Sequence, residues 1–368
     1  MNFTKQLLSW YNENKRDLPW RRTKDPYLVW ISEIILQQTR IDQGLPYYER
    51  FVSAFPNIKQ LAEAEEQEVL KLWQGLGYYS RARNLHETAR IIMKEYGGQF
   101  PDTYSGIRNL KGIGDYTAAA VASIVYELPY PVVDGNVVRF FSRYFGISEA
   151  NGLAETKKRI LEIARENIDH SYPGDFNQSI MEFGARICTP VNPACRSCIF
   201  RKKCFANGHK MVAELPVRPQ KAMVRKRYLH YLVLTCHDRG ADFIYLNKRT
   251  GNDIWKNLFD FPQVEPDKGT IQDYPMNHQA MLAVFKSGDF KSIGDEHPNS
   301  QLLRQFRGIS KKYVHQLTHQ RLHVWFYQFH FDKKVELPYL KVPLLNIHTY
   351  PLPRLIDKYL IDIFPGFH

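Results

Sequence analysis

The stretch IRNLKGIGDYTAAAVASIVYELPYPVVDGNVV, residues 107–138, decides how the fold of the whole chain is interpreted. Gly112 and Gly114 flank one apolar residue just before a helical pattern, and glycine permits the positive φ that a tight turn requires. A turn that opens onto a helix N-terminus exposes backbone N–H groups, which favour an anion such as a phosphate. The alternative is a plain turn between two helices, with Asp115 as the N-cap.

Two further features follow this turn. Residues 117–123 form a helical run of small side chains, which lets a neighbouring backbone approach closely. Asp134 then lies in the apolar segment VVDGNVV, residues 132–138. Asp134 either caps the next helix or supplies a carboxylate for chemistry, and these residues by themselves favour the cap.

Composition and charge limit the possible classes of protein. The 368 residues allow roughly two to three domains, and 14% aromatic with 24% charged residues argue against disorder. A net charge of +12 suits a polyanionic partner, although an ordinary basic protein is the alternative. No apolar run approaches the roughly 20 residues of a membrane span, and the N-terminus lacks the apolar core of a signal peptide. We therefore expect a cytoplasmic protein without membrane contact.

The cysteines are concentrated in one place. The pattern Cys188-x6-Cys195-x2-Cys198-x5-Cys204 holds four of the five, and Cys236 alone is expected to be a buried core thiol. Four close thiolates bind a structural zinc ion or a 4Fe-4S cluster. The uneven spacing is unlike the paired C-x2-C pattern of zinc ribbons, so the pattern predicts a metal site and leaves the metal to context.

Residues 1–205 are predicted to be mostly helical. The segment 26–39 is apolar nearly all round, which predicts a buried helix with Glu33 in its middle. Burial would raise the pKa of Glu33, as a general acid near neutral pH requires; the alternative is a narrow polar stripe in contact with water. Further helices are predicted near 44–55, 65–75, 80–96, 115–127, 136–145, 154–169 and 174–187.

The remaining segments have different patterns. Residues 75–83, GLGYYSRAR, place two tyrosines and two arginines on a turn, which suits base stacking and phosphate contact unless the tyrosines belong to the core. Residues 201–227 hold nine basic residues and one acidic residue, which predicts a linker near a nucleic-acid backbone. Three β-rich runs and a closing amphipathic helix then predict a separate α+β domain. These elements are expected at 228–235, 243–246, 322–327 and 354–364.

Together, the hairpin followed by Asp134, the upstream Glu33 and the cysteine pattern resemble the iron–sulfur base-excision DNA glycosylases, specifically the MutY-type adenine DNA glycosylases. The motifs are LPWRR (18–22), SEIILQQTR (32–40), LWQGLGYYSRARN (72–84), LKGIGDYTA (110–118) and VDGNV (133–137). The resemblance implies a multidomain chain with an all-α helix-hairpin-helix glycosylase domain followed by an α+β NUDIX-like domain for 8-oxoguanine recognition. The implied boundaries are 1–205 for the glycosylase domain with its 4Fe-4S module at 188–204, 206–227 for the basic linker and 228–368 for the NUDIX-like domain.

The resemblance also implies an activity. Such an enzyme flips adenine out of duplex DNA when it lies opposite 8-oxoguanine or G, and hydrolyses it from the sugar. This step begins base excision repair and prevents G:C to T:A mutations. The endonuclease III branch has a lysine where this chain has Tyr116, and that amine forms a Schiff base that cleaves the strand. Tyr116 cannot, so we expect a monofunctional enzyme. The resemblance also implies one 4Fe-4S cluster, and we expect the protein to be a monomer.

Site residues follow from the same resemblance. It implies that Glu33 is the general acid at adenine N7 and Asp134 the anion that stabilises an oxocarbenium-like sugar, supported by Tyr116 and Asn136. The implied adenine pocket is Arg16, Trp20, Arg21, Leu36 and Gln178. The implied contacts to DNA and 8-oxoguanine are Gln38, Thr39, Tyr78, Gly112, Gly114, Thr318 and His319, and the cluster ligands are Cys188, Cys195, Cys198 and Cys204.

The C-terminal motifs match the family in part. Residues 254–262 fit the Trp-x-x-Leu-x-x-Phe-Pro segment of the NUDIX-like domain, and the sequence has no box for pyrophosphate hydrolysis. Leu317-Thr318-His319 stands where the family usually has Phe-Ser-His, so a hydroxyl and the histidine are kept. Three alternatives are an endonuclease III-like lyase, a non-catalytic DNA-binding protein with zinc, and a NUDIX hydrolase. The missing box disfavours the last.

Overall fold

The computed structural model describes residues 2–150, 154–217, 224–264, 274–285, 290 and 304–364. It divides into two compact units. The N-terminal unit comprises Met1–Ala64 and Ser80–Lys221. The C-terminal unit comprises Glu65–Tyr79 and Ala222–His368. Residues 218–223 of the predicted basic linker lie outside the described residues. Within the described part of the chain, no helix is long and apolar enough to cross a membrane.

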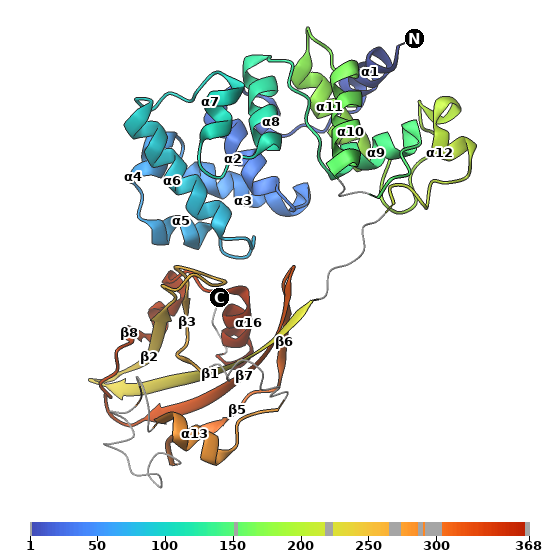
Figure 1. Cartoon of the computed structure of the whole chain (residues 1–368). Helices are drawn as coiled ribbons and strands as arrows, with labels where there is room; N and C mark the ends of the chain where they lie inside the picture. The colour runs from blue at the N-terminus through green and yellow to red at the C-terminus, as the bar shows by residue number, and fades with distance from the viewer. Residues whose placement is uncertain are drawn as a thin grey trace. The chain divides into compact units, whose positions relative to one another are not determined.

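The N-terminal unit is helical (Figure 1). Its elements are α1 Phe3–Asn14, η1 Pro19–Arg21, α2 Pro26–Leu36, α3 Ile41–Ala54, α4 Ile58–Glu63, α6 Ser80–Glu95, α7 Tyr104–Asn109, α8 Asp115–Tyr126, α9 Gly135–Phe145, α10 Ala154–Asn167, α11 Pro173–Arg186, η2 Arg201–Lys203 and α12 Phe205–Gly208. The predicted helices are confirmed with shifted ends. The short helices α4 and α7 were not predicted, because six residues give too few turns for a periodic signal.

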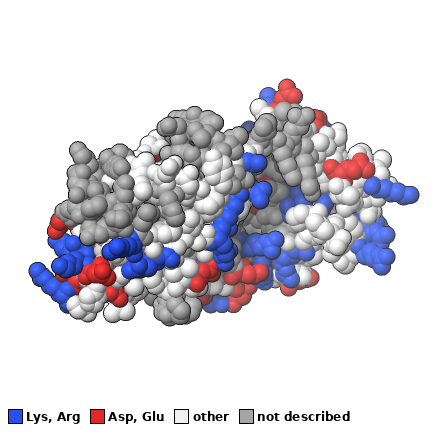
Figure 2. All heavy atoms as spheres, turned by 90° about the horizontal axis from the view of Figure 1, so that it is seen from below, with Lys and Arg blue, Asp and Glu red and all other residues white. Residues whose placement is uncertain are grey.

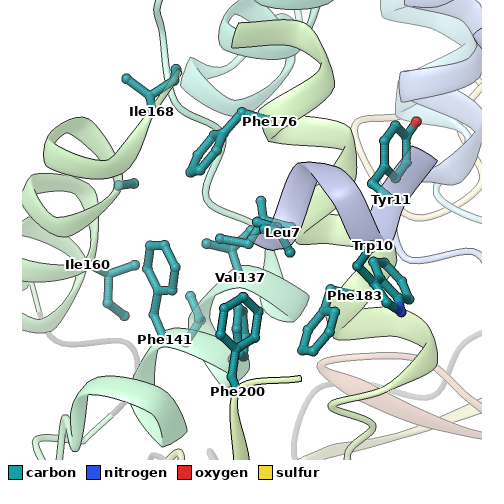
Figure 3. Close-up of a cluster of buried hydrophobic side chains, with 14 of the residues drawn as sticks. Leu7, Trp10, Tyr11, Val137, Phe141, Ile160, Ile168, Phe176, Phe183 and Phe200 are labelled. Atoms are coloured by element: carbon teal, nitrogen blue, oxygen red, sulfur yellow. The ribbon is translucent and has the colours of Figure 1, made fainter. Parts of the chain in front are cut away.

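An aromatic cluster joins the two ends of this unit (Figure 3). The Phe183 ring of α11 lies 4.9 Å from the Trp10 ring of α1 and 4.8 Å from the Phe140 ring of α9. It also lies 5.2 Å from the ring of Phe200, between the third and fourth cysteines. Since such rings bury a large apolar area, the N-terminal helix and the cysteine segment pack on one core.

The C-terminal unit is a mixed sheet with a helix on each face (Figure 1). The long central strands β1 and β7 run parallel over twelve paired positions, and the order along the main path is β3-β2-β1-β7-β5. The elements are α5 Glu66–Leu72, β1 Arg225–Asp238, β2 Ala241–Lys248, β3 Phe259–Asp260, β4 Gln263–Val264, α13 His278–Phe285, β5 Phe306–Ile309, β6 Tyr313–Gln316, β7 Gln320–Phe331, β8 Leu340–Pro343, η4 Leu344–Thr349 and α16 Arg354–Ile363.

Burial on both faces explains the apolar runs that the sequence shows in this unit. On one face of the sheet, Leu232 and Trp325 contribute to the core that includes Met281 of α13. On the other, the Phe326 ring stacks at 3.9 Å on the Tyr359 ring of α16. The α+β prediction is confirmed. A central strand that is covered on both faces has a continuous run of apolar residues instead of an alternating pattern.

Replacing Phe183 with Ala is expected to lower the free energy of unfolding by about 3–5 kcal/mol, because the ring is fully buried and its loss leaves a cavity. Urea unfolding followed by helical circular dichroism measures the change. Tyr172→Ala, at a ring that is 61% exposed, is the matched control and should change stability by less than about 0.5 kcal/mol. Wild-type stability of the Phe183→Ala variant would contradict a core centred on this ring.

Candidate active site

Helix α2 places a carboxyl group inside the N-terminal unit. Asp25 caps the helix by accepting from the Tyr27 N–H at 2.8 Å, and Pro26 occupies the first helical position. The sides of the helix are buried, and Glu33 in its middle is only 7% exposed. The alternative of a polar stripe in contact with water is therefore wrong.

Tyr116 of α8 partners this carboxyl group. Its hydroxyl donates to Glu33 Oε2 at 2.8 Å. Desolvation raises the pKa of Glu33 to about 7; the Tyr116 hydrogen bond lowers it, the charge of Asp134 raises it, and Arg21 lowers it. The predicted upward shift is confirmed. A carboxyl group with a pKa near 7 can donate a proton at neutral pH.

Asp134 is the N-cap of helix α9 and is only partly exposed. Its Oδ1 accepts from the backbone N–H groups of Asn136 and Val137 at 2.9 and 2.8 Å, and its Oδ2 accepts from Asn136 Nδ2 at 2.6 Å. Desolvation raises the pKa of Asp134, and these donors together with Arg139 oppose the rise. The cap expected from the sequence is therefore present. Three donors stabilise the Asp134 anion, whereas Glu33 accepts from one hydroxyl. When the two carboxyl groups hold one proton between them, it therefore resides on Glu33.

A close helix contact fixes the position of Asn136. A Cβ added at Gly184 of α11 would lie 2.7 Å from Asn136 Cβ and 2.9 Å from its carbonyl oxygen. Arg139 spans the same contact, since it donates to Asn136 Oδ1 at 2.9 Å and to the Gly184 carbonyl at 2.6 Å. Its Nε also donates to the Cys188 carbonyl at 2.6 Å, so one arginine connects the Asp134 cap to the first cysteine.

The hairpin turn has the predicted backbone. Gly112 has a φ of +74°, and an added Cβ would lie 2.6 Å from Asn84 Cβ, so glycine is required there on two grounds. Gly114 is the N-cap of α8 and has no side chain to cap the first N–H groups. Asp115 was the alternative N-cap, and this is wrong: it is the first residue of the helix and accepts from Arg108 Nε at 2.5 Å. The free N–H groups of the helix start can meet an anion.

Two arginines predicted for the adenine pocket meet on one buried carboxylate. Arg16 donates from Nε and Nη2 to the two oxygens of Glu182 at 2.8 and 2.7 Å, and its backbone N–H donates at 3.2 Å. Arg21 Nη2 donates to Glu182 Oε2 at 2.9 Å. These contacts lower the pKa of the Glu182 carboxyl to about 2 against the opposing effect of burial, so Glu182 is an anion.

The other pocket residues lie on neighbouring elements. Trp20 of η1 is buried and its ring meets the Tyr48 ring edge-on at 5.0 Å. Leu36 ends α2 and is half-buried. Gln178 is buried on α11, one helical turn before Glu182. A common pocket of these side chains stays a prediction.

The turn after α2 carries strain at a predicted wedge residue. Gln38 is exposed and has a φ of +56°, and the half-exposed Thr39 follows it. Arg81 Nη1 donates to the carbonyls of Ile34 and Gln37 at 2.8 and 2.7 Å and holds the helix end. Backbone strain in a residue other than glycine collects at functional sites. The sequence predicted that Arg81 contacts phosphate, whereas in the structure its guanidinium holds this turn.

Three of the predicted contacts to DNA and 8-oxoguanine, Tyr78, Thr318 and His319, lie in the C-terminal unit. Tyr78 is 46% exposed with a φ of +49°, and its hydroxyl shares a hydrogen bond with the Thr318 hydroxyl. Thr318 and His319 form the exposed turn between β6 and β7. Tyr79 is buried instead, and its hydroxyl donates to the Leu352 carbonyl at 3.3 Å. One tyrosine of the pair is thus exposed and the other belongs to the core.

The predicted cysteine ligands lie in one half-buried segment. Among the described residues, no three His, Cys, Asp or Glu side chains are gathered closely enough to bind one metal ion. Burial raises the pKa of the Cys198 thiol to about 11, and the charges of Cys188, Cys195 and Cys204 add to this rise. The buried Arg143 lies 3.5 Å from Cys188 Sγ and donates to the Thr189 carbonyl at 2.7 Å. This donor set fits a thiolate-ligated metal group.

Comparison with known proteins gives matches over both units. Residues 31–167 match the model of the HhH-GPD superfamily of base excision DNA repair proteins, and residues 230–362 match the NUDIX domain. A relative named adenine DNA glycosylase from Buchnera aphidicola subsp. Schizaphis graminum is 32% identical over 98% of each chain. The chain belongs to the adenine DNA glycosylase family. A relative of the same name from Buchnera aphidicola subsp. Acyrthosiphon pisum is 40% identical over 71% of this chain and 74% of its own.

Other members of the adenine DNA glycosylase family, and one solved structure, agree. The protein of that name from Rattus norvegicus is 42% identical over 59% of this chain and 44% of its own. A structure of a thermostable thymine-DNA glycosylase is 33% identical, covers 56% of this chain and 95% of its own, and superposes with a TM-score of 0.52. The two-domain fold expected from the resemblance is therefore confirmed.

Two buried charged residues of this adenine DNA glycosylase family member, Arg143 and Glu182, and the half-buried Arg139 were not predicted. Arg139 and Arg143 lie four residues apart in a helix that is otherwise mostly apolar on that face, and this pattern could have indicated buried cations that need partners. Glu182 lies in a helix whose neighbours are buried, as Glu33 does. The sequence contains these signals, but not the identity of the partners.

Proposed function

We propose that this protein is a monofunctional adenine DNA glycosylase that removes adenine opposite 8-oxoguanine or G in duplex DNA. The observation that carries the proposal is the buried Glu33 carboxyl, with a pKa of about 7, beside Tyr116 and within the electrostatic reach of Asp134. Two carboxyl groups with different environments are the arrangement that glycoside hydrolysis requires. That the base removed is adenine is inferred from the names of the relatives.

The reaction breaks the bond between adenine N9 and the sugar C1′. Glu33 donates its proton to adenine N7, which makes the base a neutral leaving group. The sugar gains positive charge as the bond breaks, and the Asp134 carboxylate stabilises it. A water molecule then adds to C1′ and releases a proton. Because C1′ is shielded inside a duplex, the adenine must first be flipped out of the helix.

The absence of an amine at position 116 supports hydrolysis without strand cleavage. The Tyr116 hydroxyl donates to Glu33 and has a pKa far above neutral, so it is not a nucleophile at pH 7. No Schiff base can form at this residue, and the abasic strand stays intact. The missing amine therefore distinguishes this protein from an endonuclease III-like lyase.

The lesion opposite the adenine is assigned to exposed residues on turns. Thr318 keeps the hydroxyl of the family loop, and its hydrogen bond with Tyr78 joins two predicted contacts. Gln38 and Thr39 lie on a strained, accessible turn that can fill a vacated base stack. Release of adenine at such pairs begins base excision repair and prevents G:C to T:A mutations.

Duplex DNA is the proposed partner of the monomer. Figure 2 shows Lys and Arg side chains gathered in groups on the face drawn there, as expected for a net charge of +12. The exposed run Arg201–Lys203 next to the last cysteine is suited to phosphate contact. The free N–H groups at Gly114 supply a second phosphate contact.

One 4Fe-4S cluster on the four cysteines is the proposed cofactor. A bound cluster would supply a positive centre that keeps these thiols deprotonated and ties the segment together. Arg143 and Arg139 hold the surrounding carbonyls, and Phe200 anchors the segment in the core. The role assigned to the cluster is structural, and no step of base removal passes through it.

Glu33→Gln is expected to abolish adenine release while binding of the mispaired duplex stays nearly unchanged, because the amide keeps the shape and loses the proton.

Base release is measured on duplexes with A opposite 8-oxoguanine, A opposite G, A opposite T, and thymine glycol opposite A, each with and without alkali. The wild type should release adenine only from the first two, and strand breakage should need alkali. Cleavage at thymine glycol without alkali would favour the lyase, and no release from any duplex would favour a binding protein.

The single-turnover rate of adenine release should fall as pH rises through about 7, because protonated Glu33 is the active form. The full rate is present below this pKa and is lost above it. The decrease in rate with pH, which is the alkaline limb of the profile, is measured on one duplex with A opposite 8-oxoguanine from about pH 5.5 to about 9. A rate that is constant over this range would contradict Glu33 as the acid.

The purified protein should be brown, with broad absorption near about 400 nm that an iron chelator with a reductant removes. Cys198→Ser should lower the iron content, because one of the four thiolate ligands is lost. Cys236→Ser, at a buried thiol on β1, is the control and should keep the absorption. A colourless protein that contains zinc would overturn the cluster.

A further inference from the structure

Glu182 is a buried anion between two elements of the candidate site. Its side chain is 1% exposed, while those of Arg16 and Arg21 are 33% and 12% exposed. Burial of a carboxylate is unfavourable unless several donors compensate it, and here four N–H groups do so. The two arginines are thus held in one arrangement by a single side chain.

The same turn of α11 also touches the Glu33 partner. Met181 Sδ lies 3.3 Å from the Tyr116 hydroxyl, and Glu182 follows directly in the chain. Arg21 is close enough to Glu33 for its positive charge to lower the pKa of that carboxyl. The guanidinium that Glu182 binds is therefore one that acts on the candidate acid.

We propose that Glu182 is a positioning residue that keeps Arg16 and Arg21 fixed at the adenine pocket and compensates their charge, so that Glu33 retains its proton at neutral pH. The inference rests on the proposed function. Glu182 does not touch the reacting atoms, and it acts through the arginines.

The charges facing Glu33 give the sign of the effect. Tyr116 from α8 and Arg21 from η1 lower the pKa of Glu33, and Asp134 at the start of α9 raises it. Three guanidinium groups face the Glu182 carboxylate: those of Arg16 and Arg21 at 2.7 and 2.9 Å, and that of Arg186 on the same helix at 3.9 Å. Loss of this carboxylate leaves these positive charges uncompensated, and that of Arg21, which acts on Glu33, favours ionised Glu33 and lowers its pKa.

Glu182→Gln tests the proposal, because it keeps the size of the side chain and removes the charge. The single-turnover rate of adenine release from a duplex with A opposite 8-oxoguanine is measured against pH. We expect the limb of the variant to lie about one pH unit below that of the wild type, which makes release about tenfold slower on the alkaline side. Glu166→Gln removes an equal charge from an exposed position on α10 and should leave the limb in place.

Arg21→Gln should move the alkaline limb in the opposite direction, and it tests the role of Glu182 even if Glu182→Gln does not fold. It removes a positive charge that acts on Glu33, so its limb should move to higher pH whatever its maximal rate. Limbs that stay at the wild-type pH in folded variants, or that move in the same direction, would overturn the role of Glu182. An active wild type with unmoved variants contradicts this inference alone, whereas a wild type that releases no adenine contradicts the proposed function.

Discussion

The burial of one carboxyl group in an apolar helix is the constraint on which the site depends. Glu33 loses nearly all contact with water, and a charged carboxylate there would cost several kcal/mol without compensation. The surroundings give it one hydroxyl donor and a neighbouring acidic residue. Burial and the charge of Asp134 keep a proton on Glu33 near pH 7 against the opposing effect of the hydroxyl donor, whereas Asp134 has three donors of its own.

Close helix packing makes that environment possible. The small side chains of α8 are almost all buried and lie against α2 and α11. Gly184 lets α11 approach the start of α9, where Asn136 and Arg139 hold the Asp134 cap. Larger side chains at these contacts would separate the two carboxyl groups or admit water. The rigid frame is then completed by the aromatic core, which holds the N-terminal helix and the cysteine segment together.

Local patterns in the sequence predict those features that depend on neighbours in the chain. The apolar segment around Glu33, the two glycines of the hairpin and the cysteine spacing each indicate their structure within about 30 residues. The ion pairs of Glu182 join residues 166 and 161 positions apart, and no local pattern contains such a partner. Asp115, the alternative cap, is instead the first residue of α8 and accepts a hydrogen bond from Arg108. The two-residue strands β3 and β4 exist only through their pairing with longer strands.

The most direct test is the protonation state of Glu33 in the folded protein. Carbon-13 NMR of carboxyl-labelled glutamate, with the Glu33→Gln variant used for assignment, gives the pKa of this one group. We expect a pKa near 7 for Glu33, and a higher pKa in Tyr116→Phe, because the hydroxyl hydrogen bond lowers it. A value near the ordinary 4.5 would contradict the account, since Glu33 would then be ionised at neutral pH and could not donate a proton.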